Sequence, residues 1–107
     1  MGSVKTEFSP DYFRSIFGDA PSEWATFIEV NLRSFNQGLE RLRLAANHQD
    51  MAAVSEIRHS MGPSMQQWGA ITLEAQMMAL TANNLAVHWP TIESELQDLI
   101  NALEALE

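Results

Sequence analysis

The C-terminal part of the chain carries its clearest structural pattern: residues 91–106 read TIESELQDLINALEAL. Apolar side chains recur there with spacings of four, three, four and three, at Ile92, Leu96, Leu99, Leu103 and Leu106. This period places them on one side of an α-helix and the polar residues on the other. We expect a helix that starts near Trp89-Pro90-Thr91 and buries its apolar side.

The same period extends toward the N-terminus and predicts four more helices. Ser9 as N-cap and Pro10 at the first helical position predict a short helix that ends at Gly18-Asp19. Longer helices are expected over about 20–46, with Asp19 as its cap, over about 51–69, with Asp50 as its cap, and over about 71–87. The connections at 47–49 and at Gly69-Ala70 are short, so neighbouring helices should be antiparallel.

Each long helix has a predicted buried stripe. The second helix is expected to bury Trp24, Phe27, Ile28, Phe35, Leu39, Leu42 and Ala46. The third is expected to bury Val54, Ile57, Met61, Met65 and Trp68, and the fourth Ile71, Ala75, Met78, Ala82 and Leu85. No segment alternates as a half-buried strand does. The predicted fold is all-α: an antiparallel four-helix bundle with a short additional N-terminal helix over one end of its core.

Length and composition limit the alternatives. The 107 residues, of which 46% are hydrophobic, suit a single domain over 1–107, with residues 1–7 as a flexible or partly vector-derived N-terminus. The chain has no Cys, which excludes disulfides and thiolate chemistry and suits a reducing compartment. The formal charge of −8 argues against nucleic acid as a partner. No apolar run suits a membrane span and no signal peptide is visible, so we expect a cytoplasmic protein.

The predicted third helix has an unusual second face. His59 lies opposite the apolar stripe, and its neighbours three, four and seven positions away are Ala52, Ser55, Glu56, Gly62, Pro63 and Gln66. Most of these side chains are small. We therefore expect the imidazole to stand exposed on a surface of low relief, where an ordinary solvent face would carry Lys, Arg and Glu.

Pro63 conflicts with a helix that is selected only for stability. A proline inside a helix removes the hydrogen bond to the carbonyl four residues back, here that of His59, at a cost of ~3 kcal/mol. Such local conflict often accompanies function. One alternative is that the helix ends at Met61 and that Ser64 caps a new segment. The apolar stripe continues in register across Gly62-Pro63, which favours a kinked but continuous helix.

The stretch from Ile57 to Ala70, IRHSMGPSMQQWGA, resembles the signature of histidine-containing phosphotransfer (HPt) domains. The apolar Met61, the hydroxyl residue Ser64 and the pair Gly69-Ala70 match the family pattern after the phosphorylated His. Pro63 takes the place of a small residue that is usually Gly, and Gly62 takes the place of the usual Lys. The resemblance extends to the order and length of the helices.

This resemblance implies a relay function. His59 would accept a phosphoryl group from a receiver-domain aspartate and pass it to another receiver in two-component signalling. The partners would be receiver domains of response regulators or a hybrid sensor histidine kinase, and the chain would be a monomer. It would need no cofactor, because the Mg²⁺ and the acidic pocket belong to the receiver. In this reading the chain is a phosphotransfer protein rather than a turnover enzyme.

Helix geometry suggests which residues surround that group. Gln66 and Ser55 lie nearly in line with His59 and offer an amide and a hydroxyl, whereas Arg58 points about 100° away. Gly62 and Pro63 complete the low surface. If the second and third helices fold back at 47–50, Gly38 lies level with His59 and permits close packing. Gln37 and Arg41 would then flank a docking surface.

Two other functions remain open. A helical adaptor could bind receivers without phosphotransfer, and Gly62 in place of Lys favours it. A dimerising bundle fragment of a sensor kinase is less suitable, because this chain supplies four long helices itself. We expect His48 and His88 to be capping or solvated residues, and the spacing of the three His predicts no metal site.

Overall fold

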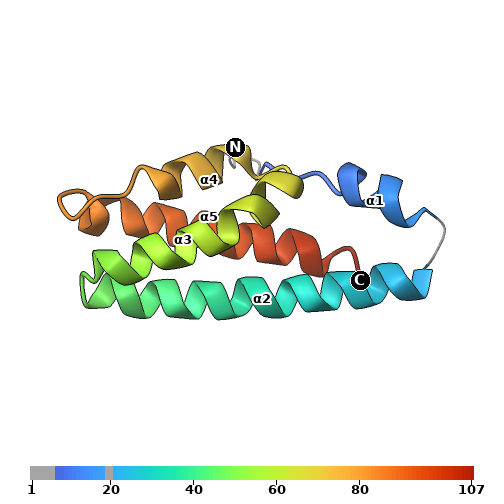
Figure 1. Cartoon of the computed structure of the whole chain (residues 1–107), viewed down its shortest axis with the longest axis horizontal. Coiled ribbons are helices and arrows are strands. Elements are labelled where there is room, and N and C mark those ends of the chain that lie inside the picture. Colours follow the sequence, from blue (N-terminus) through green and yellow to red (C-terminus); the bar gives the residue numbers. More distant parts are fainter. Residues whose placement is uncertain (1–6, 19–20) are drawn as a thin grey trace, which may run out of the picture.

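The computed structural model describes residues 7–18 and 21–107, and within these ranges the chain is all-α, without a β-strand. The helices are α1 (Asp11–Phe17), α2 (Pro21–Asn47), α3 (Met51–Gln67), α4 (Ile71–Met78) and α5 (Leu85–Glu104). From α2 to α5 the helices run back and forth along the long axis of the molecule (Figure 1). The all-α prediction is confirmed.

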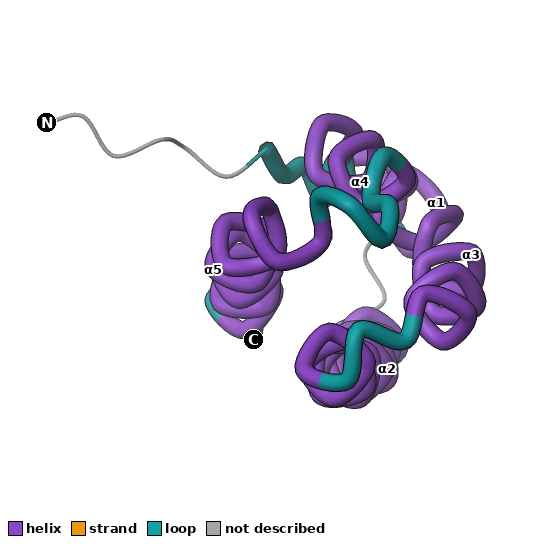
Figure 2. The backbone as a smooth tube through the Cα atoms, turned by 90° about the vertical axis from the view of Figure 1, so that its left-hand side faces the viewer, coloured by secondary structure: helices purple, strands orange, loops and turns teal. Residues whose placement is uncertain are grey.

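Helix α2 is the longest element and packs along both α3 and α5. Helix α4 contacts α3 and α5, and α1 contacts α2. Seen end-on, α2, α3, α4 and α5 surround a shared interior (Figure 2). One side of the molecule is therefore formed by α3 and α4, and the opposite side by α2 and α5.

Apolar side chains fill this interior, as the helical period predicts. The third helix buries its whole predicted stripe, which is Val54, Ile57, Met61, Met65 and Trp68. In the second helix Ile28, Phe35, Leu39 and Leu42 are buried, and Trp24, Phe27 and Ala46 pack partly buried against them. In the described part of the chain no polar or charged side chain is buried, so burial of apolar area is what stabilises the core. None of the described helices is both long enough and apolar enough to cross a bilayer.

Aromatic side chains close one end of the core beneath α1. The rings of Phe13 and Trp68 lie 4.5 Å apart, and those of Phe13 and Phe27 lie 4.6 Å apart. The buried indole of Trp68 donates a hydrogen bond of 3.1 Å from Nε1 to Oδ1 of Asn31. Helix α1 thus covers one end of the core, as expected.

The predicted caps have three different outcomes. Asp50 caps α3, since its Oδ1 accepts a hydrogen bond of 3.1 Å from the backbone N–H of Ala53. The N-cap position of α1 belongs to Pro10 rather than Ser9, although Ser9 Oγ accepts from the N–H of Asp11. Asp19 and residues 1–6 lie outside the described residues.

Helix α3 is continuous through Pro63, which excludes the alternative of a break at Met61. It ends at Gln67, two residues earlier than predicted, and Gly69 follows with φ at +83°. A Cβ on Gly69 would lie 2.9 Å from the backbone nitrogen of Ser9. Glycine is therefore required there by both the left-handed backbone and the close N-terminal segment.

The prediction of one helix over 71–87 is wrong. Helix α4 ends at Met78, and α5 begins at Leu85, four residues before Trp89. The Asn84 side chain closes the intervening loop, accepting from the N–H of Thr81 and donating to the carbonyl of Ala79. Asn side chains compete in this way with helical backbone bonds, which explains the break.

The predicted buried stripe of the fourth helix is also wrong in most positions. Ile71, Ala75, Met78 and Ala82 are exposed, whereas Leu73, Met77 and Leu80 are buried. Leu85 is buried as predicted, but it belongs to α5. The predicted stripe of α5 is confirmed for Ile92, Leu96, Leu99 and Leu103, and Leu106 is partly buried beyond its end.

Candidate functional site

His59 is exposed midway along α3, on the side opposite the buried stripe. Within the described ranges its imidazole makes no hydrogen bond or ion pair with another side chain. Pro63 has no N–H, so the carbonyl of His59 lacks its usual helical donor. The imidazole is therefore available to a partner from solvent, as the sequence predicts.

The surface beside His59 is a shallow pocket of about 240 Å³ between α3 and α4. It is lined by Arg58, His59, Gly62, Pro63, Gln66, Glu74 and Met78. The structure thus brings Gly62, Pro63 and Gln66 together with His59, as predicted. The pocket lies open to solvent beside the imidazole.

Three predicted neighbours lie elsewhere. Ser55 is exposed on α3 but does not line the pocket. Gln37 and Arg41 are exposed on α2, and Arg41 forms an ion pair of 3.6 Å with Glu56 of α3. Arg41 also borders a separate depression at the α2–α3 turn, together with Leu44, His48 and Ile57. These side chains do not form the pocket beside His59.

Arg58 fixes the α4 wall of the pocket. Its guanidinium donates from one nitrogen to the carbonyl of Met77 at 3.1 Å and to the carbonyl of Leu80 at 2.8 Å. Met77 lies in the last turn of α4, and Leu80 lies in the loop that follows it. Arg58 directly precedes His59, so these hydrogen bonds hold the end of α4 next to this part of α3.

Glu74 and Met78 are the lining residues that sequence reasoning missed. The predicted register placed Met78 in the core, but it is 47% exposed. Glu74 lies over Gly62, so closely that a Cβ on Gly62 would be 3.3 Å from Oε2 of the carboxylate. The correct register could have been found from the spacing of four and three between Leu73, Met77 and Leu80, which are the buried residues. In this register Glu74 and Met78 face α3.

Close packing of α2 against α3 supports the site from below. A Cβ on Gly38 would lie 2.6 Å from Sδ of Met61, so the two helices meet where the sequence predicts close approach. Met61 belongs to the buried face of α3, two residues beyond His59. This close contact packs α3 against α2 on the side opposite the exposed face that carries His59.

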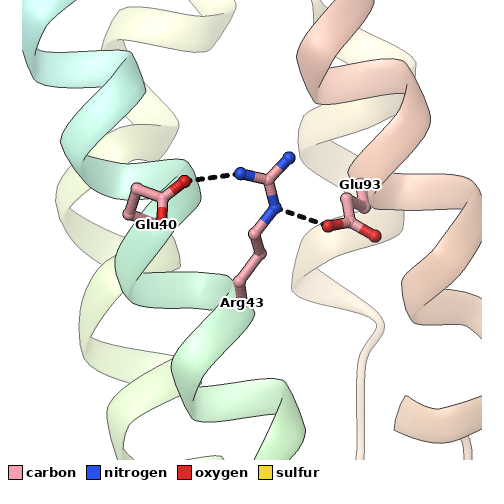
Figure 3. A network of polar contacts seen from close by, with 3 residues as sticks. All are labelled: Glu40, Arg43 and Glu93. Atoms are coloured by element: carbon pink, nitrogen blue, oxygen red, sulfur yellow. Dashed lines mark hydrogen bonds and ion pairs between the residues drawn. The ribbon is translucent and has the colours of Figure 1, made fainter.

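A polar network lies on the other side of the molecule, between α2 and α5 (Figure 3). Arg43 donates from Nε to Glu93 and from one terminal nitrogen to Glu40, each at 2.5 Å. These hydrogen bonds, that to Glu93 first, raise the pKa of the Arg43 guanidinium above its ordinary value. The contacts join α2 to α5 and lie apart from the His59 pocket, so we assign them to the scaffold.

His48 and His88 have no comparable setting. The His48 ring contacts the carbonyl of Leu44 at 2.9 Å, near the end of α2. His88 is exposed in the first turn of α5 and borders a depression with Asn84 and Thr91. Among residues 7–18 and 21–107, no group of three His, Asp or Glu side chains could hold a metal ion.

Comparison of the chain with known proteins finds no match. No family model, curated protein or solved structure matches the chain.

Proposed function

We propose that this chain is a phosphorelay intermediate of the HPt type, an antiparallel four-helix bundle closed at one end by α1. His59 would accept a phosphoryl group from a receiver-domain aspartate and pass it to a second receiver. The observation that carries the proposal is the exposed imidazole of His59 on a low pocket, opposite a fully buried apolar stripe.

The chemistry of transfer suits this position. The lone pair of an imidazole nitrogen forms the N–P bond while the O–P bond of the receiver's phosphoaspartate breaks and leaves a carboxylate. Phosphoryl transfer depends mainly on positioning and on charge stabilisation. The receiver would supply the Mg²⁺ and the acidic pocket, and this chain would supply an accessible nitrogen on a rigid helix. The proposed setting is a cytoplasmic signalling pathway, with the chain as a monomer.

The residues around His59 receive separate roles. Gly62 and Pro63 keep the surface low, so that the receiver's aspartate can reach the ring. The Gln66 amide can donate to phosphoryl oxygens. Ser55, Gln37 and Arg41 lie outside the pocket and are assigned to the rim of the docking surface.

The test is incubation with a panel of purified receivers, each phosphorylated beforehand and supplied with Mg²⁺. A cognate receiver should transfer label to this chain, and the label should be lost in acid and retained in alkali. His59→Gln should remain unlabelled, whereas Arg33→Gln, a surface change on α2, should label normally. Labelling of His59→Gln would contradict the proposal.

The second candidate is a helical adaptor that binds receivers without phosphotransfer. The position of Glu74 favours it, because a carboxylate over Gly62 is a poor neighbour for a phosphoryl group. An adaptor would bind receivers equally well after His59→Ala and would take no label from any of them. Binding that weakens together with loss of label supports the relay function instead.

A further inference from the structure

Besides Arg58, the pocket that His59 lines contains a second charged side chain, the carboxylate of Glu74. Glu74 lies in the first turn of α4, partly buried, with its Oε2 over Gly62. Within residues 7–18 and 21–107, no hydrogen bond donor or cation engages this carboxylate. Its negative charge is therefore not held in a direct hydrogen bond or ion pair there.

Two arginines near the pocket make their direct contacts with groups other than Glu74, although both keep their positive charge. Arg58 lines the pocket, but its guanidinium donates to the carbonyls of Met77 and Leu80. Arg41 of α2 pairs with Glu56 on α3 and does not line the pocket. A phosphoryl group on His59, with a charge of about −1.5 to −2 at neutral pH, would share this pocket with the carboxylate of Glu74, while the Arg58 guanidinium is held on backbone carbonyls.

We propose that Glu74 destabilises phosphorylated His59 and so favours transfer of the phosphoryl group to a receiver. This inference rests on the proposed function. In the discharge step the N–P bond to His59 breaks as the O–P bond to the receiver's aspartate forms. Repulsion by Glu74 is present in the phosphorylated chain and relieved on transfer, so it shifts the equilibrium toward the receiver.

Gly62 and Glu74 are coupled in this arrangement. A side chain at position 62 would contact the carboxylate at 3.3 Å and force it to move. Glycine at 62 therefore leaves room for the Glu74 carboxylate against α3, inside the pocket that His59 lines. The missing side chain at 62 and the carboxylate from α4 act together on the same phosphoryl group.

Glu74 also lies near the N-terminal end of α4, where a negative charge stabilises a helix. A purely structural role predicts that Glu74→Gln lowers the stability of the fold and leaves the phosphoryl group unaffected. The proposed role predicts a change in the titration of the phosphoryl group itself. A phosphorus NMR titration of the phosphorylated chain, without any receiver, separates the two.

The experiment compares wild type with Glu74→Gln and with Glu104→Gln, an equal charge change at the C-terminal end of α5. In Glu74→Gln the second pKa of the phosphoryl group should fall by about one unit, which corresponds to a tenfold change in its ionisation. The equilibrium ratio of phosphorylated chain to phosphorylated receiver should rise by about tenfold at low salt, and less at high salt. Glu104→Gln should change neither quantity.

Two results would overturn the inference, and they are distinguishable. If wild-type His59 takes label but Glu74→Gln and Glu104→Gln give the same titration and equilibrium, Glu74 has no such role while the proposed function stands. If wild-type His59 takes no label from phosphorylated receivers or from a small phosphoramidate donor, the proposed function fails, and this inference fails with it.

Discussion

The guanidinium of Arg58 donates a 2.8 Å hydrogen bond to the backbone carbonyl of Leu80, joining α3 to the loop that follows α4. A second hydrogen bond from the same nitrogen reaches Met77, in the last turn of α4. Residues 58 and 80 are far apart in the sequence. This contact fixes the end of α4, and with it the wall of the pocket that His59 lines.

Loss of the Arg58 contact should destabilise the protein. Arg58→Gln is expected to lower the free energy of unfolding by about 1–2 kcal/mol, since two hydrogen bonds from a charged donor to partly buried carbonyls are lost. Urea denaturation measures this change. Arg33→Gln, the same charge change on the exposed face of α2, should stay within about 0.5 kcal/mol of wild type. Equal losses in both variants would show that Arg58 acts only through net charge.

Pro63 lowers the stability of α3 and can be replaced with a gain. Pro63→Ala restores an N–H that can donate to the carbonyl of His59 and should raise the free energy of unfolding by about 2 kcal/mol. Pro10→Ala is the control, because Pro10 occupies the N-cap position of α1, where no helical bond is missing. Thermal and urea unfolding test the pair. A loss of stability in Pro63→Ala would contradict this account of α3.

The N-terminal segment should respond to acid through Glu7. Its carboxylate accepts from the backbone N–H of Thr72 at 2.7 Å and from the hydroxyl of Thr72 at 3.0 Å. The backbone hydrogen bond first, and then the hydroxyl, lower the pKa of Glu7 below its ordinary 4.5. A lowered carboxyl pKa stabilises the fold above the unfolded-state pKa, and this contribution is lost as pH falls through the folded-state pKa.

Wild type should therefore be more stable than Glu7→Gln near neutral pH, and the difference should shrink below pH 4.5. Unfolding curves for both proteins across that range measure it. Glu107→Gln, at the other end of the chain, is the control for the loss of one carboxylate. A stability difference between wild type and Glu7→Gln that stays constant with pH would contradict the role of the Thr72 contact.

The sequence predicts those features that depend on contacts within one helix. The stripes of α3 and α5 follow from an uninterrupted period, and Asp50 caps α3 through a residue three positions away. The exposure of His59 follows from the same geometry, because a face opposite a buried stripe must point to solvent. These predictions needed no knowledge of how the helices pack.

Helix α4 was predicted wrongly because its sequence allows more than one register. Apolar residues occur at Ile71, Leu73, Met77, Met78 and Leu80, and their spacing fits two different faces. The core selects the face that carries Leu73, Met77 and Leu80, and Arg58 of α3 binds the carbonyls of Met77 and Leu80. Since Glu74 enters the pocket only in the true register, the period alone could not place it beside His59.

The most direct test of the central claim is to map the phosphate by mass spectrometry under alkaline conditions after transfer from a phosphorylated receiver. The account predicts phosphate on His59 alone, unchanged by His48→Gln or His88→Gln and absent from His59→Gln. A phosphate on His48 or His88, or a wild-type chain that no receiver in the panel can label, would contradict it.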